Sequence, residues 1–259
     1  MTSESLDLSI ILPALLAGLL VLATHVPLGA QVLKRGIVFI DLAIAQIAAL
    51  GVILAGMADL DPQGWMVQVA AGSAAVLGAF LLTWTEKRWP AVQEAQIGVL
   101  FVLAATGSLL LLAHNPHGGE HLRDLLSGQI LWVSYKQLLL PAIGTVVILL
   151  ALRVFGERVG RLGFYLIFAL AVTASVQLVG VYLVFASLIV PSLGSRNHAP
   201  ARRLPLAFAI GVGGYASGLL LSTVVDLPSG ALIVWCLAAL AIVVYAIGPK
   251  VAPETEVTL

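Results

Sequence analysis

Two polar side chains, Asp41 and Gln46, interrupt an otherwise apolar run between residues 36 and 57. A charge inside a bilayer costs about 2.5–3.5 kcal/mol even on the most lenient scale, so it should face a partner or a wet cavity. Carboxylate oxygen is a hard ligand that suits a divalent cation, which makes Asp41 a candidate for an ion pathway. The alternative is that Asp41 pairs with a basic residue near the membrane edge. Gln46 lies about 140° further round a helix, so the two side chains do not share one face.

The densest group of metal-ligand side chains is His114-Asn-Pro-His117-Gly-Gly-Glu120-His121. Imidazole and carboxylate groups at this density fit zinc-like ions, and they favour a site that captures such an ion. Pro116 and the glycine pair predict a loop rather than a helix, so His117 and His121 are not held on one face. A solvated loop without a ligand is therefore the competing interpretation.

Composition indicates what kind of element must position these residues. The chain has 259 residues, of which 60% are hydrophobic and only 10% charged, and its mean hydropathy is +1.06. Soluble domains carry about 25% charged residues, so this chain needs lipid as its solvent. Its apolar stretches are long and continuous, which favours helices over the short alternating strands of a barrel. We therefore predict an all-α polytopic transmembrane helical bundle, with residues 1–259 as a single transmembrane domain.

The apolar stretches predict about nine membrane spans. One region decides the number, because Phe164 to Gly194 runs 31 residues without a charge. A single helix of that length would measure about 46 Å, against a hydrocarbon core of about 30 Å. The region is either one steeply tilted helix, giving eight spans, or two short spans bent near Val179–Gly180. The predicted spans are 8–28, 36–57, 66–84, 97–113, 137–152, 164–178, 180–193, 204–222 and 230–247.

Charge distribution chooses between eight and nine spans, because Lys and Arg concentrate on the cytoplasmic side. Nine spans with the N-terminus outside and the C-terminus cytoplasmic leave only Arg123 and Lys136 outside. Eight spans would leave seven basic residues inside and six outside, so nine is the better prediction. The basic residues then placed inside are Lys34, Arg35, Lys87, Arg88, Arg153, Arg158, Arg161, Arg196, Arg202, Arg203 and Lys250.

Several classes of function are disfavoured by what the sequence lacks. The formal net charge is zero, so bulk electrostatics imply no nucleic-acid partner. The single cysteine, Cys236, offers no thiolate cluster. The sequence contains neither a phosphate-binding loop nor a His-Glu-x-x-His motif, so we expect no enzyme activity and no cofactor bound by this chain. A stand-alone secondary ion carrier remains an alternative, although such carriers typically show inverted repeats and we see none.

Five segments spread over almost the whole chain carry recognisable patterns. They begin at Leu33-Lys-Arg35, Gln96-Ile-Gly98-Val-Leu-Phe101, Asp124-Leu-Leu-Ser-Gly128, Gln177-Leu-Val-Gly180 and Asp226-Leu-Pro228-Ser-Gly230. Together they resemble the zinc/manganese/iron branch of ABC importer permeases, and they occur in that family's order. The first matches the family's Arg, apolar run, Gly-Asp-Ala-Leu-Ala-His stretch, and the fourth its Val-Gly-x-Leu-Leu-Val-x-Ala-Leu-Leu-Ile-x-Pro stretch.

The resemblance implies a function and a set of partners. The chain would be the permease subunit of an importer in a bacterial inner membrane, working by alternating access. Zinc is the expected substrate, with manganese or iron as alternatives, and a vitamin or siderophore permease is the nearest rival. The implied partners are a second permease copy, forming a homodimer, a cytoplasmic ABC ATPase subunit, and an extracytoplasmic metal-binding protein.

The sequence departs from the family pattern in two places. Gln46 stands where the family has His, and Asp41 falls one position before the family's Asp, which bears on the metal carried. The segment Phe155–Gly163 is also shorter than the corresponding segment of the family, which is where we would expect the ATPase to bind. The residues that we expect to contact the ATPase instead are Arg158, Arg161, Arg196, Arg202 and Arg203.

Overall fold

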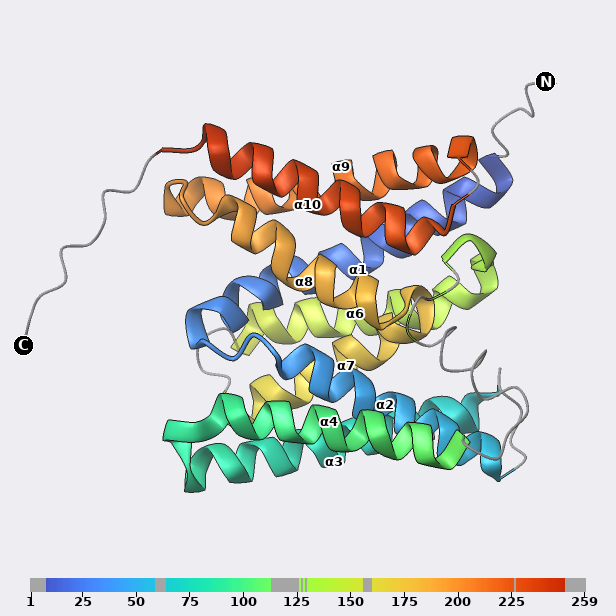
Figure 1. The fold of residues 1–259 in the computed structure, drawn as a ribbon, viewed down its shortest axis with the longest axis vertical. Helices are drawn as coiled ribbons and strands as arrows, with labels where there is room; N and C mark the ends of the chain where they lie inside the picture. Colours follow the sequence, from blue (N-terminus) through green and yellow to red (C-terminus); the bar gives the residue numbers. More distant parts are fainter. Residues whose placement is uncertain are drawn as a thin grey trace, which may run out of the picture.

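The computed structural model describes residues 8–58, 64–112, 126, 128, 130–155, 160–225 and 227–249. Helices running back and forth along one direction make up this part of the chain (Figure 1). The predicted all-α bundle is confirmed. The helices are α1 (Leu8–Arg35), α2 (Ile40–Met57), α3 (Trp65–Arg88), α4 (Gln93–Leu112), α6 (Tyr135–Phe155), α7 (Arg161–Val179), α8 (Val181–Ser195), α9 (Pro200–Val225) and α10 (Ser229–Ile247), with 3-10 turns η1 (Pro90–Val92) and η2 (Ile130–Trp132).

The predicted break near Gly180 is confirmed. Gly180 has φ +80° and ψ 163°, a conformation essentially restricted to glycine, and it ends α7 and begins α8. The two helices run in opposite directions from this point (Figure 1). Within the described ranges, eight helices are long and apolar enough to cross a membrane. α8 has 15 residues, about 22 Å of helix, and is therefore shorter than a full span.

The end of α1 shows why several helices extend beyond their predicted limits. Hydropathy ended the first span at residue 28, but the helix continues to Arg35. It stops at Gly36, whose φ of +71° allows a Schellman turn. In that turn the Gly36 N–H donates to the Leu33 carbonyl and the Ile37 N–H donates to the Val32 carbonyl. Apolarity therefore marks the length embedded in lipid, whereas a suitable capping residue decides where the helix ends.

Close backbone approach holds the bundle together, as small residues allow in lipid. A Cβ at Gly29 of α1 would collide with the Leu188 carbonyl oxygen of α8. At Gly218 of α9, a Cβ would lie 2.5 Å from the Cα of Ile233 in α10. Gly218 therefore serves the packing of α9 against α10.

Basic residues gather at one end of the bundle. Figure 1 shows that the last turns of α1, α3, α6, α8 and α10 lie together with the first turns of α2, α4, α7 and α9. Lys136, near the start of α6, belongs to the opposite end. Among the described residues, nine helices alternate in direction, the order that the nine-span prediction requires, and eight of them are long and apolar enough to cross a membrane. The basic residues at the shared end are Lys34, Arg35, Lys87, Arg88, Arg153, Arg161, Arg196, Arg202 and Arg203.

Candidate functional site

Asp41 lies in the first turn of α2, where the helix dipole favours a negative charge. Its side chain is 1% exposed, and neither carboxylate oxygen has a hydrogen-bond partner in the structure. Buried charges in proteins are normally paired with an opposite charge or coordinate a metal ion. Asp41 therefore leaves two oxygens available to a proton or a cation.

The alternative that Asp41 pairs with a basic residue finds no support in the described part of the chain. Arg35, the nearest basic residue in sequence, points elsewhere and stacks on the Phe164 ring, 4.1 Å from its centroid. This contact joins the end of α1 to the start of α7. The Phe39 N–H, just before α2, donates to Glu94 Oε1 over 3.2 Å and so fixes the start of α2 against α4. The first turn of α2 is thus anchored without using the carboxylate of Asp41.

Gln46 is also buried, with 4% of its surface exposed. It lies on a different side of α2 from Asp41. Both positions are buried because α2 is surrounded by α3, α4, α7 and α8. A buried amide and a buried carboxylate therefore lie along one helix and face different neighbours.

His25, in the middle of α1, is a further polar residue, which the sequence favours as structural or solvated rather than ligating. It is fully buried, and its Nδ1 lies 3.0 Å from the Val21 carbonyl oxygen and 3.0 Å from Thr24 Oγ1. A carbonyl can only accept, so the contact with Val21 favours the tautomer with its proton on Nδ1, which in a neutral ring leaves a lone pair on Nε2. Nε2 has no hydrogen-bond partner in the structure. The general cost of an ionisable group within a membrane could have singled out this histidine.

Thr24 also borders a small cavity between α1, α6 and α7. The cavity has a volume of about 10 Å³ and includes Thr145 and Ser175 in its lining. A polar space of this size holds about one water molecule. The cavity beside Thr24, the neighbour of His25 in sequence, therefore has room for about one water molecule and is too small to form a channel.

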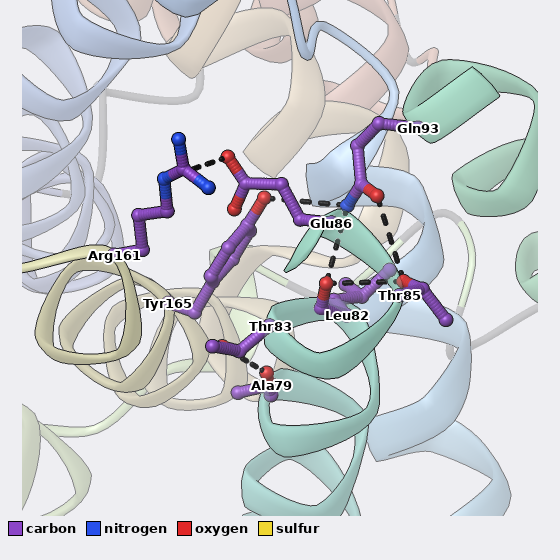
Figure 2. Close-up of polar contacts among 8 residues, drawn as sticks. All are labelled: Ala79, Leu82, Thr83, Thr85, Glu86, Gln93, Arg161 and Tyr165. Atoms are coloured by element: carbon purple, nitrogen blue, oxygen red, sulfur yellow. Dashed lines mark hydrogen bonds and ion pairs between the residues drawn. The ribbon is translucent and has the colours of Figure 1, made fainter. Parts of the chain in front are cut away.

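A second polar network lies between the ends of α3, α4 and α7 (Figure 2). The Gln93 amide donates to the Leu82 carbonyl over 3.3 Å and to the Tyr165 hydroxyl oxygen over 3.4 Å. Thr85 Oγ1 donates to the Gln93 amide oxygen over 3.5 Å. Unlike Asp41, this side chain has partners for both its nitrogen and its oxygen. The network links three helices at the basic end of the bundle.

Arg161, one of the predicted ATPase contacts, borders this network. Its Nε lies 3.5 Å from Glu86 Oε1, and its side chain is 57% exposed. Figure 2 shows the pair beside Tyr165. Arg161 therefore joins α7 to α3 while a large part of its surface stays open to a partner.

The other basic candidates lie where α8 turns into α9. Arg196 Nη2 donates to the Tyr245 hydroxyl over 3.3 Å, and Arg203 Nε donates to the His198 carbonyl over 2.8 Å. Arg196, Arg202 and Arg203 are all exposed. The turn thus presents a positive surface at the same end of the bundle as Arg161.

Several predicted residues lie outside the described ranges. His114, His117, Glu120 and His121 are among them, and so is Arg158. Within the ranges that the structure does describe, no three His, Cys, Asp or Glu side chains come close enough to hold a metal ion. Asp41 and His25 are therefore two separate buried polar residues and do not belong to one assembled metal centre.

Comparison with known proteins gives two relatives of similar length. The chain is 23% identical over 252 residues to the high-affinity zinc uptake system membrane protein ZnuB of Haemophilus influenzae, covering 89% of this chain and 95% of that protein. It is 26% identical over 270 residues to the manganese transport system membrane protein MntC of Halalkalibacterium halodurans, covering 95% and 90% respectively.

Solved structures share the fold. PsaBC from Streptococcus pneumoniae, determined in complex with Fab, superposes with a TM-score of 0.77 at 19% identity, covering 94% of both chains. An inward-facing transporter, described as being of the metal-chelate ABC type, superposes with a TM-score of 0.66 at 17% identity, covering 95% of this chain and 91% of that one. The model of the ABC 3 transport family matches residues 7–159 and 156–248, so this polytopic membrane chain belongs to the ABC 3 transport family.

Proposed function

We propose that this chain is the membrane-spanning permease subunit of an ATP-driven importer for a divalent metal ion. The observation that carries the proposal is the family match across residues 7–159 and 156–248, nearly the whole length of the chain. The sequence contains no phosphate-binding loop, so ATP hydrolysis belongs to a partner subunit. This chain then supplies the alternating pathway and performs no chemistry of its own.

Asp41 is the residue that we assign to the ion pathway. It is buried without a partner, and a divalent cation would satisfy both carboxylate oxygens. Gln46 would add a neutral amide oxygen from another side of α2, at a different stage of passage. The imidazole Nε2 of His25 is a further acceptor, available to a proton or an ion.

Zinc is the substrate that we propose first, with manganese or iron as alternatives. The relatives named above are a zinc uptake protein and a manganese transport protein. Carboxylate and amide oxygens suit harder ions such as manganese, whereas imidazole suits zinc. In this proposal the ion first binds at the extracytoplasmic end of the pathway, to His114, His117, Glu120 and His121. The imidazole groups there favour the binding of zinc over manganese before the ion reaches Asp41.

The partners follow from the distribution of charge and from the family. The basic end of the bundle faces the cytoplasm of a bacterial cell, following the positive-inside rule. An ABC ATPase subunit docks there, on Arg158, Arg161 and the turn that holds Arg196, Arg202 and Arg203. A second copy of the chain completes a homodimer, and an extracytoplasmic metal-binding protein delivers the ion to the opposite end.

Radiolabelled metal uptake by the purified permease–ATPase complex in liposomes tests the proposal. We expect ATP-dependent accumulation of ⁶⁵Zn²⁺ or ⁵⁴Mn²⁺ when the metal-binding protein is present. A matched complex whose ATPase lacks its phosphate-binding lysine should accumulate neither ion. Full uptake by the permease alone under a pH gradient would instead identify a secondary carrier. Uptake of a vitamin or an iron chelate, without free metal, would assign the chain to the rival class of permease.

A further inference from the structure

The turn between α8 and α9 is held against the last turns of α10. Arg196 donates a hydrogen bond to the Tyr245 hydroxyl over 3.3 Å, and its guanidinium lies over the same ring, 5.2 Å from the centroid. Next along the chain, His198 packs so tightly on Gly248 that a Cβ there would lie 2.7 Å from the imidazole Cε1. Arg203, from the first turn of α9, closes the turn through its 2.8 Å bond to the His198 carbonyl.

These contacts continue a close approach that begins inside the bundle. A Cβ on Gly194, in the last turn of α8, would lie 2.7 Å from the Cβ of Ala241 and 2.8 Å from its Cα. α8 and α10 run in the same direction (Figure 1). Contacts from Gly194, Arg196 and His198 therefore meet α10 at successively later positions, as a ladder between two parallel segments. Such a ladder makes the turn and the end of α10 move as one body.

α10 is also coupled to α9 along most of its length. Gly214 and Gly218 of α9 sit against Leu237 and Ile233 of α10, where an added Cβ would collide with backbone or side-chain atoms. A displacement of α10 therefore carries α9 with it, because packed backbones have no room to slide independently. The exposed part of the unit formed by α8, α9 and α10 is the turn between α8 and α9, together with Arg202 at the start of α9.

We propose that Tyr245 is a positioning residue that couples the ATPase-facing turn to α10, so that motion imposed on the turn moves α8, α9 and α10 together. The inference rests on the proposed function and adds to it the route by which nucleotide-driven motion enters the bundle. Tyr245 acts through Arg196 and need not touch the ATPase or the metal ion. Its hydroxyl and its ring hold the same guanidinium, so both contribute to the coupling.

The test compares variants of Tyr245 in the purified permease–ATPase complex. Tyr245→Ala should keep the ATPase bound and hydrolysing ATP, while the metal transported per ATP falls at least about fivefold, the lower end of usual coupling effects. Tyr245→Phe should fall less, because it keeps the ring and loses only the acceptor oxygen. Tyr182→Ala is the matched control, since Tyr182 is 57% exposed in the first turn of α8, at the opposite end of the bundle. An unchanged ratio in Tyr245→Ala, or a loss of ATPase binding that accounts for the whole fall, would overturn the inference.

A cross-link separates coupling from a general loss of structure. In a Cys236→Ser background, the pair Asn197→Cys and Tyr245→Cys removes the native contact of Tyr245, keeps Arg196 for the ATPase, and allows a short bis-maleimide to join the turn to α10. We expect the double variant to show a low ratio of metal to ATP, and cross-linking to restore it. Cross-linking that leaves the ratio low would refute the coupling role. An unmodified complex that moves no metal with ATP would instead remove the proposed function, and this inference with it.

Discussion

Gln93 and Asp41 are both buried polar residues at the start of a helix, at the same end of the bundle, yet their surroundings differ completely. Gln93, 6% exposed in α4, donates to Leu82 and Tyr165 and accepts from Thr85. Asp41, 1% exposed in α2, has no hydrogen-bond partner at either oxygen. The more expensive group to bury is therefore the one that is left unsatisfied.

This difference separates two uses of polarity within an apolar bundle. An amide with hydrogen-bond partners, such as Gln93, holds neighbouring helices in place and would not be stabilised further by a bound ion. A bare carboxylate costs stability unless something arrives to neutralise it, which is what a transient ion site requires. Substitutions at the two positions should therefore separate metal uptake from stability.

Asp41→Asn should produce the largest change. The substitution keeps the size of the side chain and removes the charge, so the metal ion loses about 1.5–3 kcal/mol of attraction, or about 10- to 100-fold in apparent affinity. Expression should stay close to that of the unmodified chain and the temperature of thermal unfolding in detergent should not fall, because no protein contact is lost and an uncompensated buried charge is removed. Uptake of ⁶⁵Zn²⁺ against metal concentration measures the change, and an unaltered curve would make Asp41 a structural residue.

Gln93→Met should show the opposite pattern. The substitution removes the amide that donates to Leu82 and Tyr165, which should lower the free energy of unfolding by about 1–2 kcal/mol, while Thr85 keeps its 3.0 Å bond to the Leu82 carbonyl. The metal concentration for half-maximal uptake should remain as before, because the network holds no ion. Denaturant titration of the purified permease measures the stability. If Gln93→Met instead weakened uptake as strongly as Asp41→Asn, the distinction between the two regions would fail.

Gln46→His tests whether the second polar position on α2 helps select the ion. Imidazole nitrogen favours zinc over manganese more than an amide oxygen does, so the preference for zinc should rise by about tenfold. Competition between ⁶⁵Zn²⁺ and unlabelled Mn²⁺ measures it, with Gln46→Asn as a variant that keeps the amide. Equal competition in all three proteins would remove Gln46 from the pathway.

Glu86→Gln should have the smallest effect. The pair between Glu86 and Arg161 spans 3.5 Å, and the arginine is 57% exposed, so its loss should cost less than about 1 kcal/mol of stability. High salt should reduce the difference further, because exposed charges are screened. A loss of ATPase binding in this variant would show that Arg161 needs Glu86 to present it to the partner.

Sequence patterns predicted most of the fold because lipid imposes simple rules. Gly180 was placed correctly at the break between α7 and α8, since a helix through the whole region would exceed the membrane thickness. The ends of α1 and α3 were predicted too early, because Lys34, Arg35, Lys87 and Arg88 lower hydropathy without ending a helix. The site was harder, because a lone histidine such as His25 has the same identity whether it is bonded or bare.

The residues alone predicted that this protein lies in a membrane, that its helices alternate in direction, and which end carries the basic side chains. Those properties depend on the apolarity and charge of each residue, which packing does not alter. Packing was needed to show that the carboxylate of Asp41 and the Nε2 of His25 lack partners, that Gln93 has them, and that Tyr245 holds Arg196. Hydrogen bonds require two groups to meet within about 3.5 Å. Residues far apart in the chain, such as Gln93 and Tyr165, meet only when the helices have packed.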